Sequence, residues 1–145
     1  MPDHIEMKLI LDSWSEGRDL GSVIDNPKLS AVMDAIDALD CAHRTIVSLS
    51  SGEFGLLMIA GPCGGGYIVN GTLNGHDFYS PKNTEAGPEK VSCFIGGQDG
   101  DYRAEQFVSR QIAETAALYF YLNQDLSPEI VWYSRNGRGT RLVRP

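Results

Sequence analysis

The sequence lacks a hydrophobic run long enough to cross a membrane. Its longest apolar runs, residues 55–60 and 116–122, are far shorter than the roughly 20 residues that span a bilayer. Charged side chains also interrupt the first 15 residues, where a signal peptide would need a continuous apolar segment. These absences predict a cytoplasmic protein that makes no contact with a membrane.

Cysteine and histidine are scarce, at three residues each. Cys41, Cys63 and Cys93 are odd in number and include no Cys-x-x-Cys pair, which argues against a disulfide framework and against a zinc site. The histidines include no pair spaced as i and i+4, the spacing of a common helical metal site. We therefore expect no bound metal and no cofactor, and a reducing cytoplasm suits such a chain.

Basic residues are in the minority and are unevenly placed. Lysine and arginine number 12 against 19 aspartate and glutamate residues, which gives a net charge of -7. Because Arg135, Arg138, Arg141 and Arg144 lie near the end, residues 1–134 hold eight basic against 19 acidic residues, a charge of -11. We predict one domain over residues 1–134 and a basic tail over residues 135–145. An acidic body repels nucleic acid and attracts basic proteins, so direct nucleic-acid binding is not expected.

Glycine, by contrast, is abundant at 16 residues, often in Gly-Gly, Asn-Gly or Asp-Gly pairs. Such pairs supply the positive φ angles of tight hairpin turns and favour an antiparallel sheet. Apolar runs predict strands near residues 5–14, 45–51, 56–60, 67–73, 91–95, 103–108 and 130–133, with loops over residues 15–22 and 76–90. With two helices added, we predict an α+β fold with a mainly antiparallel sheet of five to seven strands.

The first helix is expected after Pro27, with Asp25 or Asn26 as its cap. Apolar residues recur there every three or four positions and form one buried stripe: Leu29, Val32, Met33, Ile36 and Leu39. Acidic residues recur at intervals of three on another side of the same segment: Asp34, Asp37 and Asp40. This spacing predicts an acidic helical face.

The last third of the chain carries turn chemistry and no visible catalytic chemistry. A Gly-Gly-Gln-Asp-Gly turn starts at Gly96 and precedes a strand, and Ser109 is the expected N-cap of a helix over about residues 110–123. Pro128 and Trp132 follow this helix. We interpret Trp132 as a core residue, because it stands in an apolar strand beside a packed helix.

This order of turn, strand, helix, Pro and Trp over residues 96–132 resembles a bacterial immunity-protein family found beside polymorphic toxins, the family numbered first in that classification. The resemblance implies an antitoxin that binds one cognate toxin domain, one to one, and blocks its active site without catalysis. The acidic body suggests a toxin with a basic cleft, such as a nuclease or a nucleic-acid deaminase. Exposure and charge suggest these toxin-binding candidates: Asp34, Asp37, Asp40, Asp99, Asp101 and Tyr102.

Two other functions stay open at the level of sequence. Cys63 with His43 or His76 and an acid such as Asp77 has the residue types of a thiol nucleophile with its base, which would make the protein a small cysteine-dependent enzyme. The glycine-rich loop from Gly61 to Gly66 has backbone amides that could cradle an anion in a ligand-binding regulatory domain. A hairpin turn is the simpler interpretation of that loop, because a strand and not a helix follows it.

Overall fold

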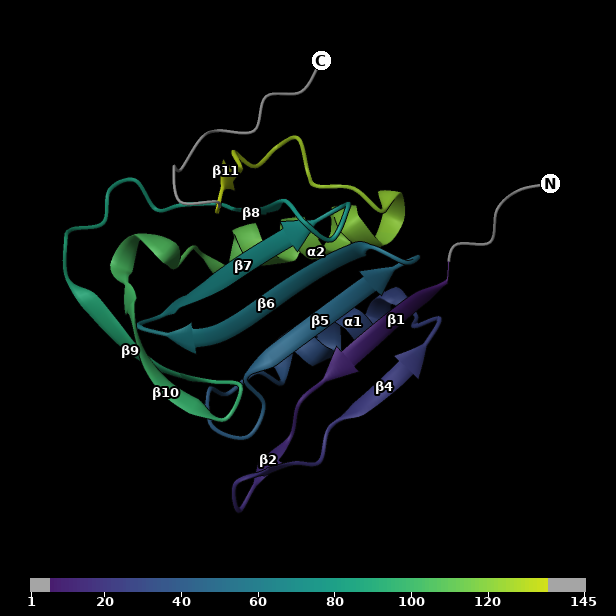
Figure 1. Cartoon of the computed structure of the whole chain (residues 1–145), viewed down its shortest axis with the longest axis horizontal. Helices are drawn as coiled ribbons and strands as arrows, with labels where there is room; N and C mark the ends of the chain where they lie inside the picture. Colours follow the sequence, from purple (N-terminus) through teal and green to yellow (C-terminus); the bar gives the residue numbers. More distant parts are fainter. Residues whose placement is uncertain (1–5, 136–145) are drawn as a thin grey trace.

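A seven-stranded antiparallel sheet forms the centre of the fold, as the computed structural model of residues 6–135 shows (Figure 1). Its strands follow the order β11 (Tyr133–Ser134), β8 (Phe78–Ser80), β7 (Gly66–Thr72), β6 (Gly55–Cys63), β5 (Ile46–Ser51), β1 (Met7–Leu11) and β4 (Ser22–Asp25). Every pairing in it is antiparallel. With its two helices this is an α+β fold, so the predicted fold class is confirmed.

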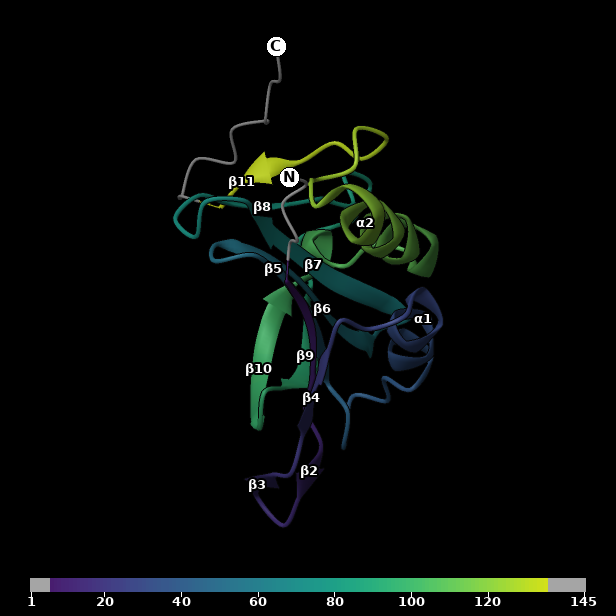
Figure 2. The same cartoon turned by 90° about the vertical axis from the view of Figure 1, so that its right-hand side faces the viewer.

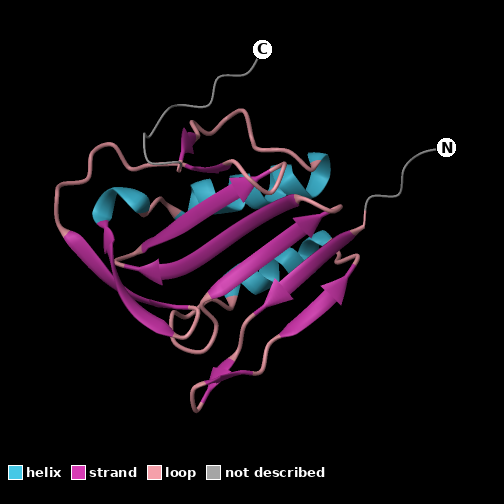
Figure 3. Cartoon of the chain, in the orientation of Figure 1, coloured by secondary structure: helices cyan, strands magenta, loops and turns pink. Residues whose placement is uncertain are grey.

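Two hairpins stand beside the main sheet. One pairs β9 (Lys90–Ile95) with β10 (Gln98–Arg103), and the other pairs the short β2 (Trp14–Ser15) with β3 (Arg18–Asp19). Figure 3 shows the β9–β10 hairpin as a separate pair of strands at the end of the sheet. Its turn consists of Gly96 and Gly97, whose φ angles of 63° and 85° require the freedom of glycine, as the sequence predicts.

Both helices lie on the same side of the sheet (Figure 2). Helix α1 (Leu29–Asp37) has Lys28 as its N-cap, so Pro27 lies just outside it and neither Asp25 nor Asn26 is the capping residue. Helix α2 (Arg110–Asn123) has the predicted bounds. The Ser109 hydroxyl accepts a hydrogen bond from the backbone N–H of Ile112 at 3.2 Å, which confirms the predicted N-cap.

The main core lies between the sheet and the helices. Leu9, Leu49 and Leu57 are neighbours on three adjacent strands and are at most 2% exposed. They belong to the same buried cluster as Phe120 of α2 and Ile36 of α1. The larger buried cluster thus lies between one face of the central strands and the helices, and a smaller one, with Ala60, Ile68 and Cys93, lies on the opposite face under the β9–β10 hairpin.

Several predicted elements differ from those observed. Residues 103–108 are not one strand, because β10 ends at Arg103 and a 3-10 helix, η1 (Ala104–Gln106), turns the chain toward α2. The loops expected over residues 15–22 and 76–90 contain short strands, whose few residues give no alternating pattern to detect. The connection expected from Gly61 to Gly66 is a tight turn at Gly64 and Gly65, and a β-bulge accounts for the remaining residues.

The prediction against a disulfide is wrong. Cys63 of β6 and Cys93 of β9 form one, and Cys41 is the free cysteine. A count of three with no short spacing concealed it, because the two bonded cysteines lie 30 residues apart on strands that meet only in the fold. The bond links the β9–β10 hairpin to the main sheet.

Trp132 is 3% exposed, and its indole N–H donates to the carbonyl of Ser127 at 2.9 Å, so its predicted core role is confirmed. The basic tail predicted over residues 135–145 lies outside the described residues except for Arg135. Within residues 6–135, no helix has the length and apolar character needed to cross a membrane.

Candidate functional site

The face of the sheet opposite the helices has no helix over it (Figure 2). Strand alternation places the directly paired residues of five strands side by side on it, in the row Val23, Ile10, Ser48, Met58 and Asn70. We call this side of β4, β1, β5, β6 and β7 the open face. Ile10 and Val23 are 39% and 56% exposed there, so the open face presents aliphatic side chains to solvent.

Two adjoining hollows lie where the open face meets η1 and β11. One measures about 180 Å³ and the other about 160 Å³, and both are lined by Ile68, Gln106 and Arg135. The second also includes Met58 and Tyr102 in its lining. We call the two hollows together the sheet groove. Each is smaller than the roughly 300–1,000 Å³ of a site that encloses a drug-sized ligand, so each suits a single side chain of a partner.

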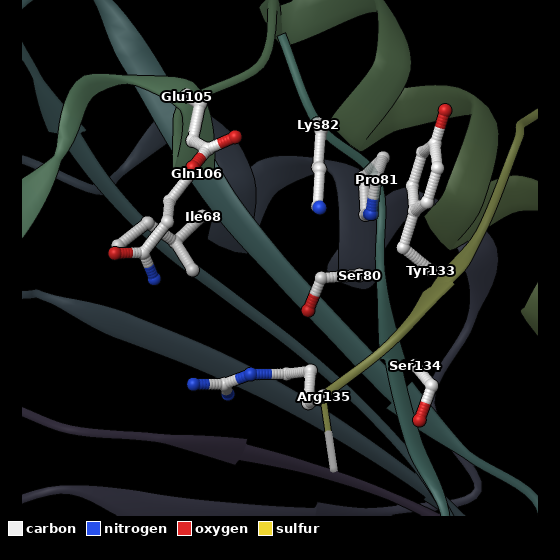
Figure 4. Close-up of a pocket in the computed structure, with 9 residues that line it drawn as sticks. All are labelled: Ile68, Ser80, Pro81, Lys82, Glu105, Gln106, Tyr133, Ser134 and Arg135. Atoms are coloured by element: carbon white, nitrogen blue, oxygen red, sulfur yellow. The ribbon is translucent and has the colours of Figure 1, made fainter. Parts of the chain in front are cut away.

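Polar groups surround the first hollow of the sheet groove (Figure 4). The Ser80 hydroxyl hydrogen-bonds the side-chain oxygen of Asn70. Lys82 holds its ammonium 4.7 Å from the centre of the Tyr133 ring, a cation–π contact. Arg135 extends toward the side where Ile68 and Gln106 lie. The groove thus joins an apolar floor to donors and acceptors at its margin, the composition of a protein-binding pocket.

A buried carboxylate that the sequence analysis missed organises the end of the sheet nearest the β9–β10 turn. Asp12 is 8% exposed, and its side chain accepts from the backbone N–H groups of Thr45 (2.8 Å) and Ile46 (2.9 Å). It also accepts from the Thr45 hydroxyl and, at 2.8 Å, from the indole N–H of Trp14. In the sequence, the one sign of a buried role for this acid is its position directly after the apolar segment that forms β1.

This carboxylate also positions the double-glycine turn, through Thr45 and Trp14. The Thr45 hydroxyl accepts from the backbone N–H of Gly96 at 3.0 Å. Gly97 lies so close to the Trp14 ring that a Cβ would come within 2.5 Å of a ring carbon. The glycine pair is therefore needed for close packing as well as for its backbone angles.

Of the three acids expected along the first helix, only Asp34 and Asp37 lie in α1, which ends at Asp37. Asp37 forms an ion pair with Arg110 of α2, and this hydrogen bond raises the pKa of the Arg110 guanidinium above its ordinary value. Arg110 also lies 3.3 Å from Glu114, measured from Nε to a carboxylate oxygen. Asp37 thus links the two helices on the side away from the open face.

The expectation that Asp40 continues the helical row is wrong. It lies in the turn after α1, and one carboxylate oxygen accepts from the backbone N–H groups of Ala42, His43 and Arg44, each at 2.9 Å. Partial burial acts to raise the pKa of Asp40, but these hydrogen bonds and the nearby His43 outweigh it, so the pKa lies below its ordinary value. Asp40 shapes this turn.

Asp99, Asp101 and Tyr102 all lie in β10, but not on one face. Tyr102 is directly opposite Val91 and packs edge-on against Phe107 with ring centres 6.3 Å apart. Asp99 and Asp101 are exposed on the other face, where Asp101 accepts from the Ser92 hydroxyl at 3.0 Å. Tyr102 therefore lines the sheet groove, whereas the two carboxylates face away from it.

The residues of the possible cysteine-dependent enzyme are not brought together as a nucleophile and base. The Cys63 sulfur is bonded to Cys93, and His43 lies 3.7 Å from Asp40 in an exposed turn. His76 lies in the turn between β7 and β8. A thiol nucleophile at Cys63 would first require reduction of its disulfide.

The glycine-rich turn borders a hollow of about 440 Å³, which also touches Glu89 and Ser109. No lysine or arginine is among the described residues that line it, and Glu89 contributes a negative charge. An anion would therefore meet no basic partner there, and the hollow gives little support to the anion-binding hypothesis.

Comparisons with family models, with curated proteins and with solved structures found no match for this chain. The resemblance over residues 96–132 to an immunity-protein family therefore stays a hypothesis.

Proposed function

We propose that this protein is an immunity protein that binds one cognate bacterial toxin domain through its open face and sheet groove and blocks the toxin's active site. The mechanism is stoichiometric occlusion and requires no catalytic residue in this chain. The observation that carries the proposal is a sheet with one face covered by helices and the other covered only at one end, by the β9–β10 hairpin, with exposed aliphatic side chains and two hollows on the rest.

Exposed aliphatic residues grouped on one surface favour a protein partner. Ile10 and Val23 are paired neighbours on adjacent strands, and the row continues through Ser48 to the half-buried Met58. Lys8 and Ser50 lie in the adjacent row of this face, so its exposed aliphatic residues stand among polar ones, a mixture that is common in protein-binding surfaces. The small size of the two hollows supports the same conclusion, because anchoring side chains of a partner fill pockets of that kind.

Net charge supports a basic partner. The described residues carry 18 acidic against nine basic side chains. A field of that sign speeds encounter with a positively charged protein, such as a toxin whose cleft holds a nucleic-acid backbone. A nuclease or nucleic-acid deaminase is therefore the toxin class we propose, and Asp34, Asp99 and Asp101 are exposed acids available for this steering.

The test is co-expression with the toxin domain encoded beside this chain. We expect toxicity to disappear and a one-to-one complex to survive gel filtration. A folded protein that forms no complex and gives no rescue would show that it is not the immunity protein of that toxin.

Two substitutions locate the binding face. Ile10 on the open face and Leu118 on α2 are both 39% exposed, so Ile10→Glu and Leu118→Glu place the same charge at equally accessible aliphatic positions. We expect Ile10→Glu to weaken toxin binding at least about 30-fold, the effect of losing one hot-spot residue, and Leu118→Glu to leave it unchanged. If instead Leu118→Glu weakened binding and Ile10→Glu did not, the interface would lie on the helices, and the immunity function would not be contradicted.

The toxin class has a separate test. Charge reversal at Asp34, and separately at Asp99 and Asp101, should slow association with the toxin at low salt and have less effect at high salt; Asp37 and Asp40 are left unchanged because they hold Arg110 and the turn after α1. Affinity that does not change with either reversal would contradict electrostatic recognition. A cognate toxin that acts on something other than nucleic acid would also exclude the proposed class.

A further inference from the structure

All three cysteines of the chain meet at one point, although they come from three segments. Cys41 lies in the turn after α1, Cys63 at the end of β6 and Cys93 in β9. Cys63 and Cys93 are bonded, the Cys41 sulfur lies 3.3 Å from the Cys93 sulfur, and all three sulfurs lie within 4.8 Å of one another. We call these residues the cysteine cluster.

We propose that the cysteine cluster, once its disulfide is reduced, binds one thiophilic metal ion of the Zn²⁺ or Cu⁺ class through three thiolates. Reduction consumes two molecules of a small thiol, which leave as their own disulfide, while Cys63 and Cys93 each gain one hydrogen. Three thiols are then present. Binding of the ion releases their three protons, because the thiolate is the form that ligates a metal.

The positions of the sulfurs suit such an ion. With a metal–sulfur distance of about 2.3 Å, three thiolates around one ion lie roughly 3.8–4.0 Å apart. The cluster already holds its sulfurs within 4.8 Å, so rotation of the cysteine side chains is enough to reach this arrangement. The Cα atoms of Cys63 and Cys93 are 5.7 Å apart, which leaves room for their sulfurs to separate without moving the strands.

The surroundings favour a soft ion over a hard one. Cys63 and Cys93 are 7% and 4% exposed and share a buried cluster with Ile68 and Phe107. Thiolates in an apolar setting select Zn²⁺ or Cu⁺, whereas Mg²⁺ and Ca²⁺ require oxygen ligands. Cys41 is half-buried, so an ion has access from its side, and a water molecule can complete the four-coordinate shell of Zn²⁺ there.

The proposed ion would hold together the same segments as the disulfide and one more. It would join the β9–β10 hairpin to β6 and to the turn after α1, close to the sheet groove that Tyr102 and Ile95 line. In a reducing compartment the hairpin would thereby keep a cross-link. This inference does not depend on the identity of any toxin.

The experiment is titration of the reduced full-length protein, under inert gas, with Zn²⁺ against a chromophoric chelator and with Cd²⁺ as a spectroscopic probe. We expect one ion per chain, thiolate-to-Cd²⁺ charge-transfer absorption of three sulfurs, and a higher unfolding temperature when Zn²⁺ is present. Cu⁺, added in a buffered form, provides the same count for a monovalent ion.

Two variants sharpen the result. Cys41→Ser removes one ligand but keeps the pair that forms the disulfide, so oxidised Cys41→Ser serves as the control for folding. We expect the reduced Cys41→Ser variant to bind Zn²⁺ at least about 100-fold more weakly than the reduced wild type, since even loss of an indirect partner of a ligand costs 10–100-fold. His43→Ala removes the histidine two residues from Cys41 and should leave the affinity unchanged.

Two outcomes would overturn the proposal. One is a reduced wild-type protein that cannot compete with the chelator, and the other is a Cys41→Ser variant that binds Zn²⁺ as tightly as the wild type. Peptide mapping that finds Cys41 bonded to Cys93 in protein that binds no metal would instead identify the cluster as a site of thiol–disulfide exchange.

Discussion

The two faces of the seven-stranded sheet are formed by the same strands but differ in burial. On the helix side, Leu9, Leu49 and Leu57 are at most 2% exposed, whereas their sequence neighbours on the open face include Ile10 at 39%. A sheet that served stability alone would present polar residues on its uncovered side. In the function we propose, the toxin covers the aliphatic residues that remain exposed there.

Truncation on the two faces should have the largest and most unequal effects on stability. Phe120 of α2 is fully buried on the helix side, so Phe120→Ala should cost about 3–5 kcal/mol of unfolding free energy through lost contacts and a cavity. Met58 on the open face is only half-buried, and Met58→Ala should cost about 1 kcal/mol. Urea denaturation measures both. Equal losses would contradict the distinction between a packed face and an unpartnered one.

The next largest effect is expected at the hydrogen-bond network that positions the β9–β10 turn. Asp12→Asn keeps the shape of the side chain, but its amide N–H group would face the donors of the Thr45 hydroxyl and the Trp14 indole. We expect a loss of about 2–3 kcal/mol, because buried donors are left unsatisfied. Asp25→Asn, an exposed change in β4, is the control and should cost less than about 0.5 kcal/mol. Similar losses from both would show that Asp12 is not a structural centre.

Local patterns predicted the parts of the fold that depend on neighbouring residues. The bounds of α2, its Ser109 cap and the Gly96–Gly97 turn follow from capping and turn chemistry within a few positions. The prediction for Asp40 is wrong because it used spacing alone: the spacing fits the helix, but the Asp40 carboxylate stabilises the turn that follows. A side chain of this kind competes with the helix for backbone N–H groups.

Features that join distant segments could not be predicted in this way. The open face depends on which side of β5 is buried. Alternation does not decide this, because Ile46 and Ser48 lie on one side and Val47 and Leu49 on the other, so both sides carry an apolar residue. The Cys63–Cys93 bond and the contacts of Asp12 with residues 33 and 34 positions away likewise arise only from the strand order. The candidate site is made almost wholly of such contacts, so of the residues chosen for charge and exposure only Tyr102 lines the sheet groove.

A smaller effect should separate the packing role of the double-glycine turn from its backbone role. Gly97 and Gly52 both have positive φ, at 85° and 64°, but only Gly97 has a side chain, Trp14, close to where its Cβ would lie. Gly52→Ala should therefore cost about 1–2 kcal/mol from backbone strain alone. Gly97→Ala should cost roughly 1 kcal/mol more, and this excess should be absent when Gly97→Ala is compared with Gly97 in a Trp14→Ala background, which already lacks the Trp14–Asp12 hydrogen bond. Thermal unfolding of the set measures the difference; identical values for the two glycine variants would exclude close packing of the turn.

The smallest effect, and the only one tied to pH, is expected at Asp40. Its pKa in the folded protein lies below the unfolded value of about 3.9, so the ionised carboxylate stabilises the fold above that pH and loses this effect as the pH falls through the folded pKa. Asn at this position can still accept from the turn's backbone N–H groups but lacks the charge. Because the Asp40 side chain is 48% exposed, Asp40→Asn should cost only about 0.5–1 kcal/mol at pH 7. Urea unfolding at pH 7 and at pH 2.5 should show this difference shrinking at the lower pH. A difference that stays constant would mean that Asp40 acts through the shape of its side chain, and then neither its charge nor its low pKa would matter to the turn.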